Sequence, residues 1–593
     1  MRSESSKKVL FVSGIFLIAF ILRFASLGTI PLSEDEAILA LQAKSLASGI
    51  PNYGIAQPLY VLITAFIFKF FGPTDFTARL FPALMGIFLV SIPFFFSEKI
   101  SQKKKYLFAF CLAIDPALVA WSRQADSLIP LIFLIALAII LFRRGSEKTA
   151  VALAALSFLG GERFFPFLAA SGIIFALIYW INRYFLKLDF KRSEETRKQV
   201  NKQNLLIFLS VLIVAGMGLL AFPEGINGIG NGIINGFKIN VNHDFRSVGF
   251  VPLLIAFFVY EGSAVLLFLI KYIKSISKKE KPQVIAMSCM ILFAAILSIF
   301  NQGILIIPWI SLPLWFFSTD VILSFRPIKK TEIDLPMAIA ILIPPILSFF
   351  LLLRLSEMLR MGDLSLPLQF TWQNQAVSTP FSRLAAYLLI IVICIIIFAV
   401  LLPMLLDYFS PGKIKKGMLY GCLSVLLVCT FGSSWKAAGF SNTKDDPFLH
   451  TSASRHELIL GNQIVQIENQ IIPIIQEIGW KATGFIHQAS GIILVDNDPM
   501  LRWTLQYYPD VVFTDVLDIR TNSPSFVITE GSEYEPLWAS YVGLVSDWKT
   551  TDHWEMYRTN DWLSWIIYRK PVISGQKLVI WQQSRFLTKT NLE

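Results

Sequence analysis

Charged residues are scarce in this sequence. Asp, Glu, Lys and Arg make up 16% of its 593 residues, whereas hydrophobic residues make up 55%. An ordinary soluble domain carries about a quarter charged residues. Apolar runs of roughly 16 to 25 residues recur between residues 9 and 434, and a run of about 20 residues crosses a hydrocarbon core. The composition excludes an ordinary soluble protein and predicts a polytopic α-helical membrane protein.

Cysteine and histidine are also rare, with five residues of each type. All five cysteines lie in apolar runs, and none lies in residues 435–593. This distribution predicts buried thiols and does not support a disulfide framework or a cysteine-based metal site. The first apolar run follows Lys7 and Lys8 but is not followed by a small-x-small cleavage site, so we expect a retained first span.

The net charge of +11 does not indicate nucleic-acid binding, because Lys and Arg gather in short connections between apolar runs. Such basic connections alternate with connections poorer in Lys and Arg, which is the positive-inside pattern. It predicts a cytoplasmic N-terminus, a membrane module over residues 1–434 and a large first outer loop over residues 28–78. The 13 predicted spans are residues 9–27, 79–97, 106–121, 127–142, 149–160, 166–182, 204–222, 250–270, 283–300, 304–324, 336–353, 382–406 and 417–434.

An odd number of spans places residues 435–593 outside the cell membrane. The segments 484–498 and 511–530 contain short apolar stretches broken by Asp, Asn, Ser and Pro, which is typical of strands. Residues 456–480 have apolar residues at helical spacing. We therefore expect an extracytoplasmic mixed α/β domain, long enough to bury its own core.

The outer loops carry further predictions. Residues 35–49, "DEAILALQAKSLASG", are expected to form an amphipathic surface helix that ends before Gly49 and Pro51. Residues 57–72 look like a short span, but a crossing there would reverse the charge pattern that follows, so we expect a second, interfacial helix. The Gly-rich part of the outer loop 223–249 is expected to be a flexible loop.

Three acids, Glu34, Asp35 and Glu36, stand together at the start of the predicted surface helix. One interpretation is helix capping, because free backbone N–H groups and the helix dipole favour acids in a first turn. The other is chemical, because a carboxylate at the membrane rim can accept a proton from an acceptor hydroxyl or amine. The residues alone leave both interpretations open.

Three segments in order give the chain a resemblance to a known family: "PLSEDEAILALQAKSLASG", "QPLYVLITAFIFKFFGPTDFTARLFPALMGIF" and "DPALVAWSRQADSLIPLIFLIAL". Together they resemble the N-terminal module of the GT-C superfamily of integral-membrane glycosyltransferases, most closely its protein O-mannosyltransferase and aminoarabinose transferase branch. The resemblance covers residues 9 to 180 and, more loosely, 204 to 250. It implies inverting transfer of a sugar from a polyprenyl-phosphate-linked donor to an acceptor on the outer face.

The resemblance also implies roles for single residues. Asp35 matches the general base of the first outer loop, and Glu36 is the adjacent acid that orients the acceptor or helps hold a metal. Asp126 matches a second acidic position, at the outer end of the fourth span. Arg123, three residues earlier, is a candidate ligand of the donor phosphate; the alternative is that Arg123 and Asp126 only pair with each other.

Two further sites follow from the same resemblance. In the outer loop 223–249, Arg246 is expected to bind the lipid phosphate and His243 to reach a divalent metal cation, although a lone His is a weak metal signal. Where aminoarabinose transferases carry a phosphate-binding Lys, this chain has Gln57, and Arg163 is a candidate replacement for the missing cation. Glu162 is the alternative partner of Arg163, in which case both residues are structural.

The sequence therefore predicts a multi-pass cell-membrane glycosyltransferase of hexosyl or pentosyl type. Its expected partners are a polyprenyl-phosphate-linked sugar donor, membrane lipids and an acceptor that is a protein, a lipid or a glycan, with no nucleic acid. One rival is a transporter or flippase of lipid-linked sugars, which would place ionisable residues and broken helices deep in the membrane. The other is a catalytically silent protein that binds a lipid-linked sugar.

Overall fold

A computed structural model describes most of the chain. The described residues are 2–29, 31–181, 202–237, 250–299, 305–325, 334–360, 367–372, 375–401, 404, 407–408, 413–438, 463–465, 467–495, 498–514, 524–530, 540–552, 557–568 and 573–586.

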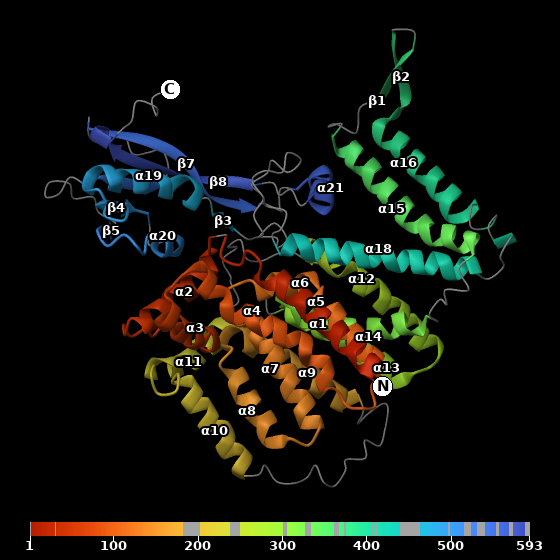
Figure 1. The fold of residues 1–593 in the computed structure, drawn as a ribbon, viewed down its shortest axis with the longest axis horizontal. Coiled ribbons are helices and arrows are strands. Elements are labelled where there is room, and N and C mark those ends of the chain that lie inside the picture. Colours follow the sequence, from red (N-terminus) through yellow and green to blue (C-terminus); the bar gives the residue numbers. More distant parts are fainter. Residues whose placement is uncertain are drawn as a thin grey trace.

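Helices coincide with all 13 predicted spans (Figure 1). They are α1 (Arg2–Phe24), α4 (Asp75–Ser91) continued by η1 (Ile92–Phe95), α5 (Gln102–Ala113) with α6 (Pro116–Ser122), α7 (Leu128–Arg143), α8 (Glu147–Phe158), α9 (Phe164–Ile181), α10 (Lys202–Gly216), α12 (Phe250–Ser277), α13 (Lys281–Ile299), α14 (Ile306–Ser324), α15 (Leu335–Arg360), α16 (Arg383–Ile395) continued by η8 (Ile396–Leu401), and α18 (Lys413–Ala437). Within the described part of the chain, seven helices are long and apolar enough to cross a membrane. The bent pair α5 and α6 would make an eighth, and α7 and α10 are apolar but shorter.

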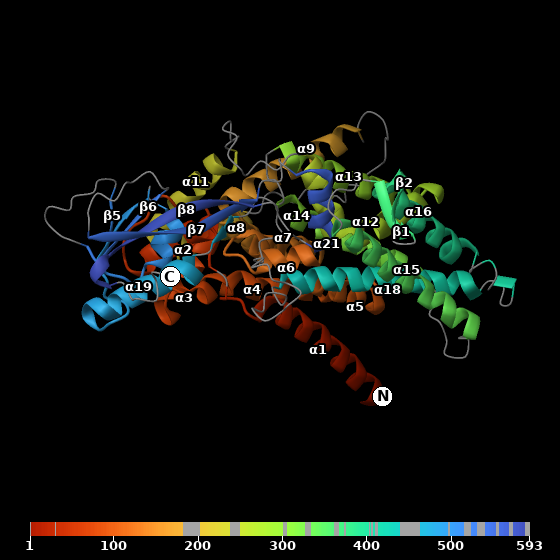
Figure 2. The same ribbon diagram turned by 90° about the horizontal axis from the view of Figure 1, so that it is seen from above.

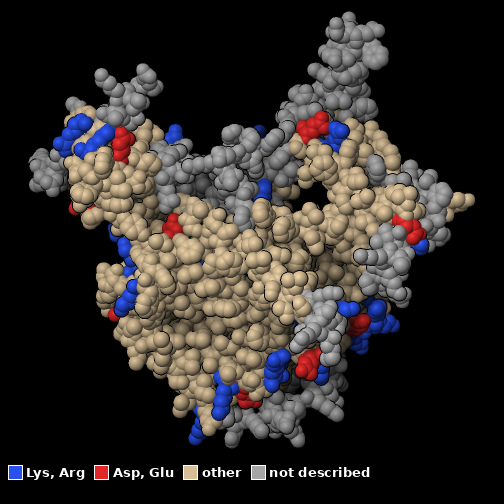
Figure 3. Space-filling model, in the orientation of Figure 1, with Lys and Arg blue, Asp and Glu red and all other residues tan. Residues whose placement is uncertain are grey.

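The surface of the helical module fits a bilayer. A wide central area of the face in Figure 3 carries almost no charge, while Lys and Arg gather along its lower edge. Large hydrophobic side chains such as Phe175, Phe349 and Val428 are exposed on α9, α15 and α18. Exposed apolar surface of this extent marks an interaction surface, and together with the long apolar helices it fits contact with lipid. The chain is a polytopic helical membrane protein, as its composition predicts.

The first outer loop folds into two short helices, α2 (Glu34–Ala47) and α3 (Pro58–Phe71). Ser33 is the residue before α2, and Pro58 opens α3, where its missing N–H costs nothing. Gly72 ends α3 with a positive φ of 80°. With 14 residues, α3 is short for a crossing, which agrees with the predicted surface position.

One prediction for an outer loop is wrong. Residues 227–236, expected as flexible loop, form the helix α11 (Asn227–Gly236) after the short turn η5 (Pro223–Ile226). A Cβ on Gly228 would lie 2.4 Å from Pro58 Cγ, and one on Gly232 would lie 2.6 Å from Gly161 Cα. The glycines therefore let α11 pack directly on the backbone beside α3 and η2 (Gly161–Arg163), which offsets their low helix propensity.

The outer loop predicted between the eleventh and twelfth spans, residues 354–381, contains helix and strand residues. Helix α15 continues to Arg360, and a two-stranded hairpin follows, made of β1 (Pro367–Trp372) and β2 (Gln375–Ser382). The hairpin extends away from the helices in Figure 1.

The C-terminal domain is a mixed α/β structure, as predicted. Its six-stranded sheet has the order β3-β7-β8-β6-β4-β5, with β5 and β6 parallel to β4 and the other pairs antiparallel. The strands are β3 (Gln463–Val465), β4 (Gly491–Leu494), β5 (Val511–Phe513), β6 (Phe526–Glu530), β7 (Tyr541–Asp552) and β8 (Ile573–Gln583). The helices are α19 (Ile467–Thr483), α20 (Pro499–Thr504) and α21 (Thr559–Tyr568).

This domain packs on the first outer loop (Figures 1 and 2). The indole of Trp503, which is 3% exposed, donates to Asp75 Oδ1 at 2.6 Å and lies 5.8 Å from the ring of Phe68. The hydroxyl of Tyr507 donates to the carbonyl of Pro73 at 2.5 Å. The domain therefore lies on the same side of the helices as α2 and α3, and its extracytoplasmic location stays a prediction.

Candidate active site

Adjacent acids at the start of α2 point into different environments. Asp35 is exposed, whereas Glu36 is 3% exposed and belongs to the buried face of the helix. Successive residues of a helix are about 100° apart, so one carboxylate can face solvent while its neighbour faces the protein. The two interpretations of the acid cluster therefore apply to different residues. Glu36 has a structural position in the first turn, whereas Asp35 is accessible, as a chemical role requires.

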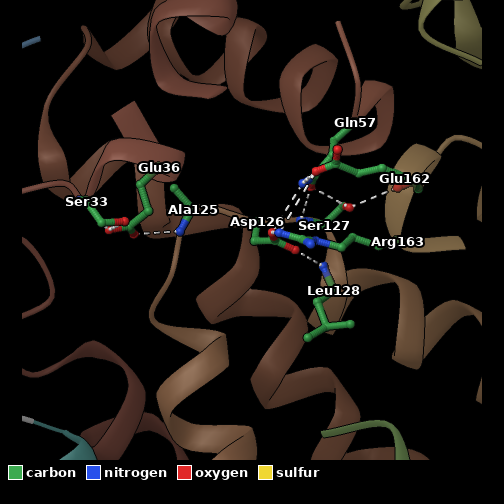
Figure 4. A network of polar contacts seen from close by, with 10 residues as sticks. Ser33, Glu36, Gln57, Ala125, Asp126, Ser127, Leu128, Glu162 and Arg163 are labelled. Carbon is green, nitrogen blue, oxygen red and sulfur yellow. Dashed lines mark hydrogen bonds and ion pairs between the residues drawn. The ribbon is translucent and has the colours of Figure 1, made fainter. Parts of the chain in front are cut away.

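Glu36 holds three parts of the chain together. Its carboxylate accepts hydrogen bonds from Arg79 Nε and Nη2, both at 2.8 Å, and from the backbone N–H of Ser33 at 3.0 Å. Its Oε1 also accepts from the backbone N–H of Ala125 at 2.8 Å. Arg79, on α4, is 2% exposed. Figure 4 shows the Glu36 side chain turned toward Ala125, the residue before Asp126. We therefore interpret Glu36 as a residue that positions the site.

Asp126 is the centre of a second polar network, at the start of α7 (Figure 4). Its Oδ1 accepts from the backbone N–H of Leu128 at 2.7 Å, which caps the helix. Its Oδ2 accepts from Arg163 Nε at 3.0 Å and Nη2 at 2.8 Å, and from Gln57 Nε2 at 3.2 Å. Asp126 is 6% exposed, so this ion pair is largely shielded from water.

Gln57 joins the same network from the start of α3. Its Nε2 also donates to Glu162 Oε1 at 2.8 Å, and its Oε1 accepts from the backbone N–H of Ser127 at 2.9 Å and from the Ser127 hydroxyl at 2.7 Å. A lysine at this position could not accept the two bonds from Ser127. Gln57 therefore fits its buried position as an amide, and Arg163 is the cation nearest to it in this network.

Arg163 connects this network to Asp35. It is more closely paired with Asp126 than with Glu162, whose Oε1 lies 4.0 Å from Arg163 Nη2. Its side chain is 16% exposed, and its Nη1 makes no hydrogen bond to any residue that the structure describes. Asp35 lies near enough to act electrostatically on the Arg163 guanidinium. An accessible carboxylate and a partly accessible cation thus lie within electrostatic reach of each other.

Arg123 lies elsewhere. Its Nη1 donates to the carbonyl of Leu22 at 3.0 Å, and its Nη2 donates to those of Ala25 and Ser26 at 2.8 and 3.2 Å. The side chain, 4% exposed, thereby closes the C-terminal end of α1. The alternative that Arg123 pairs with Asp126 is wrong, because Asp126 pairs with Arg163. Phosphate binding by Arg123 stays a prediction, and in this structure its Nη1 and Nη2 donate to these three carbonyls.

The second outer-loop site falls outside the described residues. Both Arg246 and His243 lie in the segment 238–249, which the structure does not describe. Within the residues that it does describe, no group of three or more His, Cys, Asp or Glu side chains could hold a metal ion. Phosphate binding by Arg246 and metal binding by His243 stay predictions.

Sequence reasoning missed two residues of the site. Arg79 lies 43 residues after Glu36, near the outer end of a predicted span. A charged residue in an apolar span needs a partner, and this was the signal in the sequence that could have identified it. Tyr60 is fully buried on α3, and its hydroxyl donates to the carbonyl of Ala78 at 2.8 Å. Burial raises the pKa of the Tyr60 phenol well above its usual value, so it remains a neutral neighbour of the two networks.

Comparison with known proteins gives a likeness in fold alone. No protein-family model and no curated protein matches the sequence. Among solved structures, ArnT from Cupriavidus metallidurans bound to undecaprenyl phosphate is similar with a TM-score of 0.53 and 14% identity over 98% of this chain and 99% of that one. Its apo structure gives the same TM-score and identity over 99% of each chain.

A weaker likeness extends to the archaeal oligosaccharyltransferase AglB from Archaeoglobus fulgidus in complex with an inhibitory peptide and a dolichol-phosphate. There the TM-score is 0.38 at 11% identity, over 86% of this chain and 64% of that one, which is too low to carry an argument. The likeness to ArnT extends over nearly the whole chain and confirms, for the fold, the resemblance that the three N-terminal segments predict. The chain has the fold of ArnT, an aminoarabinose transferase of the GT-C glycosyltransferases.

Proposed function

We propose that this protein is a membrane glycosyltransferase that moves a sugar from a polyprenyl-phosphate-linked donor to an acceptor by direct, inverting displacement. The observation that carries the proposal is an exposed carboxylate, Asp35, within electrostatic reach of a partly exposed cation, Arg163, on the fold of ArnT. Undecaprenyl phosphate bound to ArnT supports a polyprenyl phosphate as the carrier.

In this proposal Asp35 is the general base. It takes the proton from the acceptor hydroxyl or amine as that atom attacks the anomeric carbon, while the bond from this carbon to the phosphate oxygen breaks. The departing phosphate gains negative charge, and a fixed cation stabilises that charge best where water is scarce. Arg163 supplies this cation through Nη1, while Asp126 holds its other nitrogens in place.

Gln57 and Glu162 complete the setting of Arg163. Gln57 bridges the carboxylates of Asp126 and Glu162 through Nε2, which keeps the two acids in fixed positions beside the guanidinium. Glu36 has no reacting role in this proposal, because its carboxylate is buried against Arg79 and Ala125. A divalent cation at His243 is a separate proposal, tested by turnover before and after chelation.

The test is a cell-free transfer assay. Purified protein in native lipids receives radiolabelled polyprenyl-phosphate sugars, and donor consumption is compared between wild type and Asp35→Asn. Since a positioned base contributes about 10²- to 10⁴-fold, we expect Asp35→Asn to lower turnover by that factor. Glu34→Gln is the matched control, because it removes one charge from the same helical turn.

The outcomes separate the proposal from its rivals. Equal donor consumption by wild type and Asp35→Asn would refute the role of Asp35. If no donor is consumed although the lipid binds, the protein is not a transferase of these donors. The two rival functions, a catalytically silent lipid-sugar-binding protein and a transporter of lipid-linked sugars, would then be favoured.

One observation favours the transporter as a second candidate. Among the described residues, Asp115 and Glu261 are fully buried, and Asp115 lies at the 57° bend between α5 and α6. Buried acids and broken helices near the membrane midplane are typical of secondary transporters. Movement of a labelled lipid across proteoliposomes without glycosyl transfer would support that function over the transferase.

A further inference from the structure

A cluster of charged side chains lies inside the helical module, apart from the candidate active site. Asp115 stands at the break between α5 and α6, Glu261 on α12, and Arg23 on α1, and all three are fully buried. Isolated charges in such surroundings are costly, so the cluster requires partners that balance its charge.

Asp115 has three partners that favour its ionised form. Its Oδ1 accepts from the backbone N–H of Leu118 at 2.6 Å, and its Oδ2 accepts from the indole N–H of Trp315 at 2.8 Å. The positive charge of Arg23 acts on it. Arg23 itself donates to the carbonyls of Ala113 and Leu112, at 3.0 and 3.1 Å. Asp115 and Arg23 therefore balance each other with one charge apiece.

Glu261 has a different environment. Its Oε1 accepts from the hydroxyl of Ser311 at 2.8 Å. Its Oε2 is buried, and no group in the described part of the chain donates a hydrogen bond to it. The Glu261 carboxyl group nevertheless lies within hydrogen-bonding reach of the Asp115 carboxyl group. Two carboxyl groups form a hydrogen bond only when one of them carries a proton.

We infer that Asp115 and Glu261 form a proton-binding site, in which Glu261 carries the proton on Oε2 and donates it to the ionised Asp115. This arrangement gives every oxygen of the pair a partner and leaves the cluster of Arg23, Asp115 and Glu261 with no net charge. The site joins α1, the break between α5 and α6, α12 and, through Ser311 and Trp315, α14. It is independent of the transfer reaction.

The other groups around the pair fit this assignment. Cys111 on α5 is buried and lies within electrostatic reach of Asp115. Ser311 and Trp315 on α14 are neutral hydrogen-bond donors. Arg23 is the one cation that acts on Asp115 among the described residues. A second ionised carboxylate would have no cation of its own here.

Infrared spectroscopy tests the proton directly. The carbonyl stretch of a protonated carboxyl group is absent from carboxylates and shifts in D₂O. We expect this band in the wild-type protein at neutral pH and its loss in Glu261→Gln. Glu280→Gln, at a more exposed acid that pairs with Lys271 at 3.6 Å, is the matched control and should keep the band. A wild-type spectrum without a protonated-carboxyl band that depends on Glu261 would overturn the assignment.

Thermal unfolding of two amide variants gives a second, independent readout. In Glu261→Gln the amide N–H₂ replaces the donated proton, so its unfolding temperature should match that of the wild type. Asp115→Asn removes the negative charge that balances Arg23. It also places an amide N–H₂ group against an N–H donor, so the unfolding temperature of this variant should fall clearly. Equal losses of unfolding temperature in both variants would show that Glu261 is ionised and would refute the proton site.

Discussion

The buried pair of Glu36 and Arg79 gives a prediction with a definite size. Removing one partner of a buried ion pair leaves the other charge without compensation and costs about 3–5 kcal/mol. Both side chains are 3% exposed, and Arg79 Nη2 lies 2.8 Å from Glu36 Oε2. Arg79→Met keeps much of the side-chain volume but removes the charge. Glu36→Gln keeps the shape but turns an N–H₂ group toward the guanidinium. We expect each variant to lose stability of this order.

The assay is reversible unfolding in detergent, followed by tryptophan fluorescence, for both single variants and the double variant. The double variant should be more stable than the sum of the single effects allows, by about 1–3 kcal/mol, because the second substitution removes a charge that is already unpaired. Glu477→Gln is the matched control, since Glu477 and Lys481 form a surface pair of similar length, 2.6 Å. It should cost about 0.5 kcal/mol.

Single losses no larger than that of the surface control, together with simple additivity in the double variant, would refute a strong coupling between Glu36 and Arg79. That result would mean that water or other groups compensate the charge of Glu36 when Arg79 is absent. Glu36 would then not be fixed by its pairing with α4.

Two more predictions concern the packing around the site. Trp503→Phe removes the charge-assisted hydrogen bond to Asp75 and should cost about 1.5–3 kcal/mol, measured as earlier proteolytic release of the C-terminal domain in a denaturant series. Unchanged release would show that this bond does not hold the domain. Gly232→Ala places a Cβ 2.6 Å from Gly161 Cα and should cost about 1–3 kcal/mol in unfolding experiments. Gly230→Ala, with no atom within 4 Å, is its control, and equal effects of the two variants would contradict close packing of α11.

The membrane helices could be predicted because their signal is local. Each predicted span is an apolar run with basic residues at one end. The same pattern predicts a surface position for residues 57–72, and the 14-residue length of α3 agrees with it. Helix α11 was missed for the opposite reason. Its glycines lower helix propensity, and the compensating contacts with Pro58 and Gly161 come from distant parts of the chain.

The partners of the site residues could not be predicted from spacing. Asp126 and Arg163 are 37 positions apart in the sequence, and Glu36 and Arg79 are 43 apart. The predicted pairing of Arg123 with Asp126 was wrong because the two residues do not share a helix. Arg123 is the C-cap residue of α6, and the backbone leaves the helix there. A sequence separation of three predicts a shared helical face only where one helix includes both residues.

The position of Glu36 explains how Asp35 and Asp126, which are far apart in the sequence, are held in fixed positions relative to each other. Glu36 follows Asp35 on α2, and it accepts a hydrogen bond from Ala125, which precedes Asp126. One buried carboxylate thus fixes the chain beside each of the two candidate acids. Its substitution should shift both, and so lower turnover together with stability. Asp35→Asn, at an exposed position, should lower turnover alone. That contrast distinguishes a residue that positions the site from one that reacts in it.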